Sequence, residues 1–441
     1  MALVASFAVL GCAVDAPTND RPNLVLIVVD TLRADALTPY GAPDTASPNI
    51  DRLARSGATF DNAVAVSPWT GPSVSSMVTG RYPNELGIHD LRTPLPPNAT
   101  TLAIHLGRAG YTTGAVVSND IAGPSYGHAV GYDFFHFESY KGERSDGPRL
   151  PAFRADGVTG VAVAWIEDRG PSLFFGPAPP FFLHVHYTDP HEPYLPPAVF
   201  RDAALEGLER LDDRYLLEKT FVSSPPTQGQ LASLEASYRG EVAFVDAQIG
   251  RLLASLPENT AVVLASDHGE EFWDHGGFLH GHSLYEELLR VAMIVRGPGV
   301  PPGVRVASTV SHVDIAPTLL DFAGIEPSGA AAMSGRSLLA LARGEVADEP
   351  TVFSAVATER GEWLTARSGA FKLHVLPRTA RVQLFDVERD PREHRDLSGQ
   401  RPAVTRKLRE ALVDWQGRGS ARTTGADPKR LEALRAIGYI E

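Results

Sequence analysis

Cysteine is almost absent from the chain, which has one such residue, Cys12, among 441. A single cysteine excludes an internal disulfide framework, and it excludes metal or redox sites built from several thiolates. Any metal site must therefore use carboxylates, imidazoles or hydroxyls. Cys12 lies far along the sequence from the segment around Thr70.

Basic residues are in the minority, because 40 Lys and Arg stand against 53 Asp and Glu and give a net charge of −13. This charge argues against a nucleic-acid partner, since a nucleic-acid groove needs a basic field. An anionic substrate would have to be held by a metal ion or by a few local cations.

Long apolar runs are also missing, and none approaches the ~20 residues of a membrane span. Residues 2–11 are a short uncharged run that leads into Cys12. This pattern resembles the lipobox of a bacterial lipoprotein signal. It predicts an exported periplasmic or cell-surface lipoprotein, with residues 13–21 as a tether and the lipid on Cys12 as its only membrane contact.

The apolar segments that are present alternate between two periodicities, as in α/β proteins. Strand-like runs occupy residues 23–30, 112–119, 181–189, 260–267 and 290–296. Helical spacing occurs at residues 50–56, 75–79, 101–108, 158–168, 228–256 and 313–323. The pattern predicts a large, mostly parallel sheet sandwiched by helices.

The last part of the chain follows another pattern. Strand-like segments at 351–357, 363–368, 371–376 and 383–386 precede a helical segment at 403–416. This order predicts a small C-terminal α+β domain. We therefore expect a leader at residues 1–21, a catalytic domain at 22–345 and a C-terminal subdomain at 346–441.

Four of the predicted strands end on a polar residue: Asp30, Asn119, Asp189 and Asp267. Because ligands of open α/β sheets bind beyond the carboxyl ends of the strands, we expect these side chains to converge. Thr70 is a further candidate, since it stands just before the Pro72-Ser73 helix start, where backbone N–H groups point at an anion. Its hydroxyl can attack phosphorus or sulfur if a metal ion lowers its pKa.

Many motifs follow one another in a family-like order. They include residues 26–35 (LIVVDTLRAD), 47–53 (SPNIDRL), 72–83, 189–194 (DPHEPY), 266–270 (SDHGE), 310–324 and 434–440 (LRAIGYI). With these motifs the chain resembles the sulfatase branch of the alkaline-phosphatase-like superfamily, from about residue 22 to its end. The resemblance implies that Asp30, Asp267 and His268 are metal ligands and that Thr70 is a nucleophile that also touches the metal. Such a donor set suits a divalent ion, namely Ca²⁺, Mn²⁺, Mg²⁺ or Zn²⁺.

The chain also departs from the family pattern. Sulfatases of this type begin the nucleophile motif with a Cys or Ser that becomes formylglycine, and they place an Arg where Val74 stands here. Thr70 cannot give the aldehyde, and a threonine nucleophile instead resembles the phosphodiesterase, nucleotide pyrophosphatase and lipoteichoic-acid synthase branches. Thr31 replaces a second Asp ligand. Residues 117–119 stand where sulfatases carry a segment with Lys and His that holds the sulfate. This chain has Asn119 there, so we expect a neutral contact with the substrate.

Three histidines complete the candidate site. His191 matches a family position near the leaving group, where it would act as a general acid or a transition-state donor. His280 and His282 occupy a stretch where relatives have a Lys or His facing the substrate, and we expect His280 to be catalytic and His282 to bind substrate. Asp189, His191 and His280 are also an alternative second metal site, as in two-zinc relatives. His275, by contrast, is expected in a solvated loop.

Together these features predict a metal-dependent sulfatase-family hydrolase of sulfate or phosphate esters. Its partner would be an anionic ester, such as a glycan or a lipid headgroup. One alternative is a phosphotransferase or phosphodiesterase that acts on envelope glycans or lipids. Another is a catalytically weak homologue that binds glycans, since Arg and Lys contacts to the oxyanion are lost.

Overall fold

The computed structural model describes residues 21–43, 45–88, 90–140, 152–169, 178–201, 225–326, 332–345, 349–358 and 361–422. Cys12 and the motif at 434–440 lie outside these residues, so the predicted lipid anchor is not part of the structural description. Within the described ranges, no helix has the length and apolar character needed to cross a bilayer.

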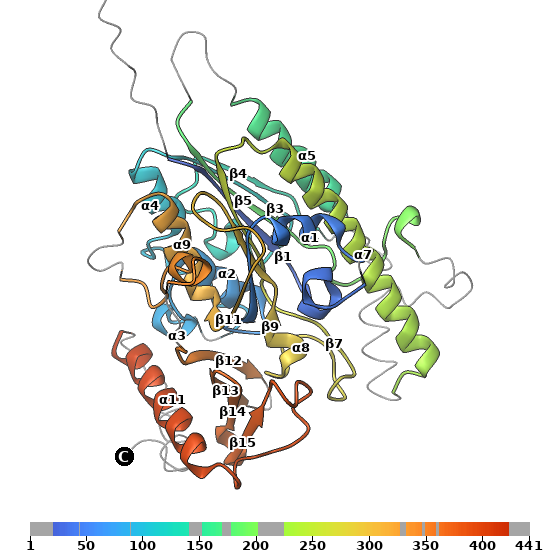
Figure 1. Ribbon diagram of the computed structural model, residues 1–441, viewed down its shortest axis with the longest axis vertical. Coiled ribbons are helices and arrows are strands. Elements are labelled where there is room, and N and C mark those ends of the chain that lie inside the picture. The colour runs from blue at the N-terminus through green and yellow to red at the C-terminus, as the bar shows by residue number, and fades with distance from the viewer. Residues whose placement is uncertain are drawn as a thin grey trace, which may run out of the picture.

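A large mixed sheet forms the centre of the molecule (Figure 1). Its strands follow the order β11-β2-β10-β6-β1-β5-β3-β4, and β9 pairs with β2. Their bounds are β1 Asn23–Val29, β2 Ala58–Val64, β3 Thr112–Val117, β4 Phe134–Phe137, β5 Phe181–Tyr187, β6 Thr260–Ser266, β9 Arg290–Val291, β10 Met293–Arg296 and β11 Val304–Ser311. The strands β6, β1, β5, β3 and β4 are mutually parallel, so their carboxyl ends share one edge.

Helices cover both faces of this sheet, as the sequence predicts. One face packs against α1 (Pro48–Arg55), α5 (Ala155–Glu167) and α7 (Gln228–Ser255), and Figure 1 shows α5 and α7 lying side by side. The other face packs against α2 (Thr70–Thr79), α4 (Leu102–Arg108), α9 (Ile315–Phe322) and α10 (Leu339–Ala342). The strand β1 contributes to both layers, because its side chains from residue 24 to residue 29 are apolar and buried and alternate between the two faces.

The predicted strand at 290–296 is two strands. β9 and β10 are separated by Ala292, and β10 runs antiparallel to both β6 and β2. The strands β2, β4 and β11 are not predicted from the sequence. In β2, Asp61 and Asn62 interrupt the apolar run. The sheet is therefore mostly parallel, with an antiparallel strand inside it.

The C-terminal part is a separate antiparallel sheet with one long helix. The order is β12 (Val352–Thr358), β13 (Gly361–Ser368), β14 (Phe371–Leu376) and β15 (Arg381–Asp386), followed by α11 (Pro402–Arg422). Leu408, Leu412 and Trp415 of α11 pack against apolar side chains of the sheet. This confirms the predicted α+β character of the C-terminal part.

A buried charge network joins the two sheets. Glu286, on the short helix α8 (Glu286–Leu289), accepts from Lys372 Nζ at 2.9 Å and pairs with Arg367 Nη1 at 3.0 Å. Lys372 Nζ also lies 3.1 Å from Glu393 Oε1. Burial alone would raise the pKa of Glu286, but Lys372 and Arg367 lower it to about 2. The network therefore stays ionised although it is buried.

We expect Glu286→Gln to lower the free energy of unfolding by about 3 kcal/mol near neutral pH, because Lys372 and Arg367 lose their shared carboxylate. The pKa of Glu286 is lower in the folded protein than the ordinary 4.5, so its contribution is present above pH 4.5 and is lost toward pH 2. Urea unfolding of both proteins at several pH values measures the difference. A difference that stays constant down to about pH 3 would contradict this assignment.

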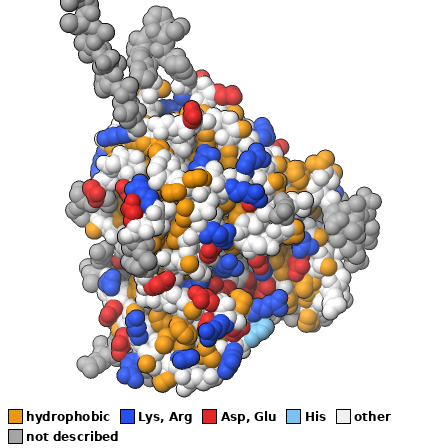
Figure 2. Space-filling view, viewed as in Figure 1, with side chains coloured by type: hydrophobic (Ala, Val, Ile, Leu, Met, Phe, Trp, Pro, Cys, Tyr) orange, Lys and Arg blue, Asp and Glu red, His pale blue; other side chains and the backbone are white. Residues whose placement is uncertain are grey.

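A cavity of about 730 Å³ lies between the main sheet and the C-terminal part, bordered by Glu286, Glu287 and Arg367. Figure 2 shows acidic side chains gathered in the hollow at this place. His275 also lines the cavity, where its Nδ1 lies 2.8 Å from Glu287 Oε1 and its Nε2 lies 2.8 Å from the carbonyl of Arg392. His275 lies in the loop between β7 and β8, as expected, and its side chain is 13% exposed because the ring stacks on Tyr285 and contacts these acceptors.

Candidate active site at the carboxyl ends of the strands

Asp30 follows β1 directly and is fully buried. Its backbone N–H continues the sheet pairing by donating to Tyr187 O at 2.9 Å. The next residue, Thr31, has φ 53°, a left-handed conformation that a β-branched residue rarely adopts. Thr31 N donates to Asp267 Oδ1 at 3.1 Å, which ties the turn after β1 to the end of β6. The strained turn therefore holds the carboxyl groups of Asp30 and Asp267 in one place.

His268 is oriented by its own neighbour. Its Nδ1 lies 2.9 Å from the carbonyl of Gly269, so Nδ1–H donates there and Nε2 is left for the site. This Nε2 lies 3.6 Å from Asp30 Oδ1 and 3.6 Å from Asp267 Oδ2. A histidine whose other ring nitrogen donates to a carbonyl is typical of metal ligands.

Thr70 is the first residue of α2, where the helix dipole is positive. Its Oγ1 lies 3.4 Å from His268 Nε2, and its side chain is almost fully buried. The helix begins five residues earlier than the predicted helical segment. The structure thus brings Thr70 next to Asp30, Asp267 and His268, as the resemblance implies, although the four come from three distant parts of the chain.

The two carboxyl groups of this cluster are hard to ionise in the absence of a cation. Burial, together with the charge of Asp267, raises the pKa of Asp30 to about 7, although His191 and His268 lower it. Burial likewise raises the pKa of Asp267 to about 6, although hydrogen bonds from Thr31, His268 and Thr70 lower it. Burial lowers the pKa of His268, so its imidazole is neutral. A divalent cation would favour all three deprotonated forms.

The donor set fits a divalent metal ion. One ligand atom each of Asp30, Asp267 and His268 lies within 4.8 Å of the others, and all three residues are buried. Asp30 Oδ1 is buried and has no hydrogen-bond partner, which is costly unless a cation satisfies it. Two carboxylates and one imidazole suit hard or borderline ions.

Asn119 lies at the edge of this cluster. Its Nδ2 donates to Asp30 Oδ2 at 2.5 Å, and its Oδ1 accepts from the backbone N–H of Ile121 at 2.7 Å. The side chain is therefore held against a candidate metal ligand. Its predicted contact with substrate stays a prediction.

Asp189 does not join the cluster, although it follows β5 as predicted. Its Oδ1 accepts from Arg154 Nε at 3.1 Å and its Oδ2 accepts from Ala155 N at 2.9 Å. Arg154 is in turn paired with Glu241 at 2.7 Å. The four strand-end residues thus converge only in part, because this buried ion-pair network turns the Asp189 carboxylate toward α5 and α7.

His191 and His280 stand beside the cluster. Their ring centroids are 5.1 Å apart, and the His280 ring lies 4.6 Å from the His268 ring. Together with Glu192, they are a second group whose ligand atoms lie within 4.8 Å of one another. The carboxylate of this second group is thus Glu192, whereas the sequence predicts Asp189. His282 is not part of this group, and its Nε2 lies 2.6 Å from Glu271 Oε2. Its predicted contact with substrate stays a prediction.

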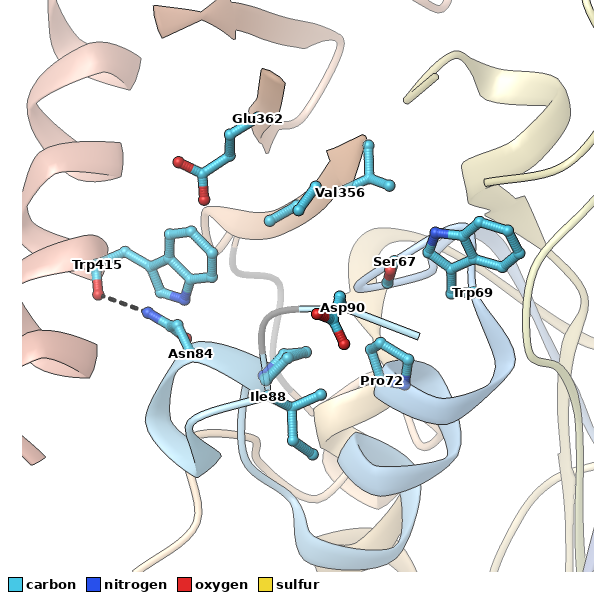
Figure 3. A pocket seen from close by; sticks show the side chains of 12 residues that line it. Ser67, Trp69, Pro72, Asn84, Ile88, Asp90, Val356, Glu362 and Trp415 are labelled. Atoms are coloured by element: carbon cyan, nitrogen blue, oxygen red, sulfur yellow. Dashed lines mark hydrogen bonds between the residues drawn. The ribbon is translucent and has the colours of Figure 1, made fainter. Parts of the chain in front are cut away.

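Trp69, the residue before Thr70, lies between His280 and the C-terminal part. Its ring contacts His280 edge-on at 5.3 Å, and a Cβ on Gly281 would overlap the same ring. On its other side, a cavity of about 30 Å³ separates Trp69 and Pro72 from Val356 of β12 and Trp415 of α11 (Figure 3). This space is small and lies between α2 and the C-terminal part.

Comparison with known proteins decides the family. The family model described as Sulfatase matches residues 22–325, and the model described as N-sulphoglucosamine sulphohydrolase, C-terminal, matches residues 274–417. The chain belongs to the sulfatase family. It is a sulfatase-family hydrolase, a class whose relatives act on sulfate and phosphonate esters.

Individual relatives resemble the whole chain. A choline-sulfatase of Rhizobium meliloti (strain 1021) is 27% identical over 430 residues, which cover 86% of this chain and 83% of the relative. A solved structure in complex with D-glucosamine-2-N,6-O-disulfate has a TM-score of 0.73 at 22% identity and covers 92% of this chain and 100% of that chain. The phosphonate monoester hydrolase of Silicibacter pomeroyi has a TM-score of 0.72 at 22% identity, with coverages of 90% and 96%. The two structures show that the fold is shared.

Proposed function

We propose that this sulfatase-family chain is a metal-dependent hydrolase of sulfate or phosphate esters in which Thr70 is the nucleophile. The observation that carries the proposal is the position of Thr70 Oγ1, 3.4 Å from His268 Nε2 and beside the buried carboxyl groups of Asp30 and Asp267. The start of α2 adds a positive field where the hydroxyl meets an anion.

Asp30, Asp267 and His268 would hold the ion. A bound divalent cation supplies charge neutralisation for the ester oxygens and lowers the pKa of a hydroxyl beside it. The chain itself fixes the ligands, because Asp267 Oδ1 accepts from Thr31 N and from His268 N, at 3.1 and 2.8 Å. Only Oδ2 of that carboxylate then remains for the ion.

Catalysis would follow two displacements at sulfur or phosphorus. Thr70 Oγ1 gives its proton to solvent and forms a bond to that atom while the bond to the leaving oxygen breaks. His280 or His191 gives the leaving oxygen its proton. Water then attacks the threonine ester and gives a proton back to the same histidine, the Thr70 oxygen leaves and regains a proton from solvent, and sulfate or phosphate is released.

The threonine favours phosphate or phosphonate esters within this class. A formylglycine hydrate can expel sulfate by breaking a carbon–oxygen bond, but a threonine ester must be broken at sulfur or phosphorus by a second attack. Histidines rather than Lys or Arg lower the pKa of Asp30, so the local positive charge is modest. Such a site depends strongly on its ion for binding an anion.

The setting of the enzyme is part of the same proposal. The Cys12 pattern supports an exported lipoprotein that meets its substrate in the periplasm or at the cell surface. An anionic glycan or lipid headgroup ester is the substrate class that such a location offers.

An ester panel tests the proposal. Purified protein, stripped with a chelator and reloaded with Mn²⁺, Zn²⁺, Mg²⁺ or Ca²⁺, is offered aryl sulfate, phosphate monoester, phosphate diester and phosphonate esters. We expect turnover of at least one ester with at least one ion, and loss of that turnover after stripping. Full turnover without metal would contradict the proposal, and so would tight glycan binding with no turnover of any ester.

A further inference from the structure

The hairpin that follows the metal cluster places a carboxylate against His280. Its strands β7 (Glu271–Phe272) and β8 (Phe278–Leu279) are antiparallel, and Glu271 is paired with Leu279. The residues one step beyond this pair are Glu270 and His280, so the ladder brings them opposite each other. His280 Nδ1 accordingly lies 2.9 Å from Glu270 Oε1, and both side chains are buried.

Glu270 is itself held in position. Its Oε2 accepts a hydrogen bond from Tyr194 OH at 2.9 Å, and its carbonyl accepts from Arg33 Nη1 at 3.0 Å. Both carboxylate oxygens thus have a partner, and Oε1 is directed to His280. A carboxylate that receives Nδ1–H fixes the tautomer and the ring orientation of a histidine, which leaves Nε2 on the opposite side of the ring.

The ring of His280 is confined on its other sides. Trp69 and His191 contact it edge-on, with centroids at 5.3 and 5.1 Å, and the His268 ring lies at 4.6 Å. Leu279, the residue before it, has φ 68°, a strained conformation for a side chain of its size. Strain next to a confined ring indicates that the orientation of His280 is specified at some cost in stability.

We propose that Glu270 is a positioning residue that keeps Nδ1–H of His280 engaged and thereby directs its Nε2 at the leaving-group oxygen of the ester. This inference rests on the proposed function, and it assigns a role to a residue that the motif analysis did not single out. Glu270 touches no reacting atom. It acts through His280, so its effect depends on how much the leaving group needs a proton.

The experiment compares wild type with Glu270→Gln over a series of aryl and alkyl esters whose leaving alcohols differ in pKa. Gln keeps an oxygen for His280 Nδ1–H but removes the charge, whereas Glu270→Ala removes both. We expect kcat/KM on poor leaving groups to fall by about 10-fold in the Gln variant and about 100-fold in the Ala variant, chiefly through kcat. Esters of acidic phenols should lose much less, so a plot of log kcat/KM against leaving-group pKa becomes steeper.

The matched control is Glu287→Gln. Glu287 holds His275 Nδ1 at 2.8 Å, a pair of the same chemistry that lines the cavity toward the C-terminal part. This variant should leave the slope of the plot unchanged. A loss in Glu270→Gln that is equal for all leaving groups would reduce Glu270 to a structural role and overturn the inference.

Two further readouts separate failure of this inference from failure of the proposed function. Metal content should be the same in wild type and in Glu270→Gln, and loss of an ion would instead make His280 part of a second metal site. The imidazole nitrogen shifts of His280 report its tautomer by NMR whether or not any ester is turned over. We expect wild type to carry a proton on Nδ1 in every state, and a second proton on Nε2 in the state that donates to the leaving oxygen. A form with a proton on Nε2 and none on Nδ1 would overturn the inference even in an inactive protein.

Discussion

Thr70→Ala should lower kcat on every ester that the wild-type protein hydrolyses by about 10⁴-fold or more, the scale of losing a covalent nucleophile. The reason is geometric, since the hydroxyl at the start of α2 stands beside His268 and the two carboxyl groups, and alanine leaves no oxygen there. The folded structure should survive, because the change removes one hydroxyl and one methyl group. Steady-state kinetics with the ester panel measure the effect.

Two variants show whether that loss comes from the nucleophile. Thr70→Ser keeps a hydroxyl at the same position and should retain a substantial part of the activity. Thr79→Ala removes a buried threonine hydroxyl from the other end of α2, where Oγ1 donates to Ser75 O at 2.6 Å, and should leave kcat close to that of wild type. If Thr70→Ala turned over any of these esters at the wild-type rate, Thr70 would not be the nucleophile. Acid-quenched wild-type reactions should in addition carry a sulfate or phosphate adduct on Thr70.

Asp267→Asn should remove the bound ion and lower kcat/KM by about 10³-fold, since metal stabilisation of a transition state is worth several kcal/mol. Asn can keep the oxygen that accepts from Thr31 N and His268 N, so the turn is preserved while the oxygen offered to the ion becomes an amide N–H. Metal content after dialysis, together with the ester panel, measures both effects.

The control is Asp189→Asn, which changes an equally buried carboxylate at the end of the neighbouring strand β5. Because Asp189 is paired with Arg154, its variant should keep the ion, although the protein becomes less stable. Equal metal loss in both variants would show that metal binding reports general destabilisation.

The ion should also compete with protons, since the pKa of Asp30 is about 7 and that of Asp267 about 6 without it. Affinity should therefore rise between about pH 6 and pH 8, by ~20-fold.

The α/β fold could be predicted because its central strands are buried on both faces. A run such as β1, apolar at every position from residue 24 to 29, is legible from composition alone. The sequence does not indicate β2 because Asp61 and Asn62, which are only partly buried, interrupt its apolar run in the middle of the strand, where Arg305 pairs with Asp61. The reversed direction of β10 depends on its two neighbours in the sheet, which no local pattern specifies.

Only those residues of the site that belong to the ordered motifs could be predicted from the sequence. Asp30, Thr70, Asp267 and His268 are brought together as the resemblance implies, whereas their chemical roles stay predictions. Asp189 does not join the cluster with Asp30 and Asp267, because it pairs with Arg154. The two residues are 35 positions apart in the sequence, and only the tertiary structure brings them together. The sequence gives Glu270 no visible role beyond its place in the SDHGE motif, because its contact with His280 follows from a hairpin whose strands are two residues long.

The tip of that hairpin carries a consequence for protein engineering. His275 fastens it to the carbonyl of Arg392, while β12 is fastened to the segment before Thr70 through Ala355 N and Val66 O, at 3.0 Å. The C-terminal lobe thus contacts both the segment before Thr70 and the hairpin that leads to His280. A chimaera that exchanges this lobe between relatives would have to carry the hairpin and the segment before α2 along with it. The unit to exchange would then consist of three parts, namely the C-terminal lobe, the hairpin of β7 and β8, and the segment before α2.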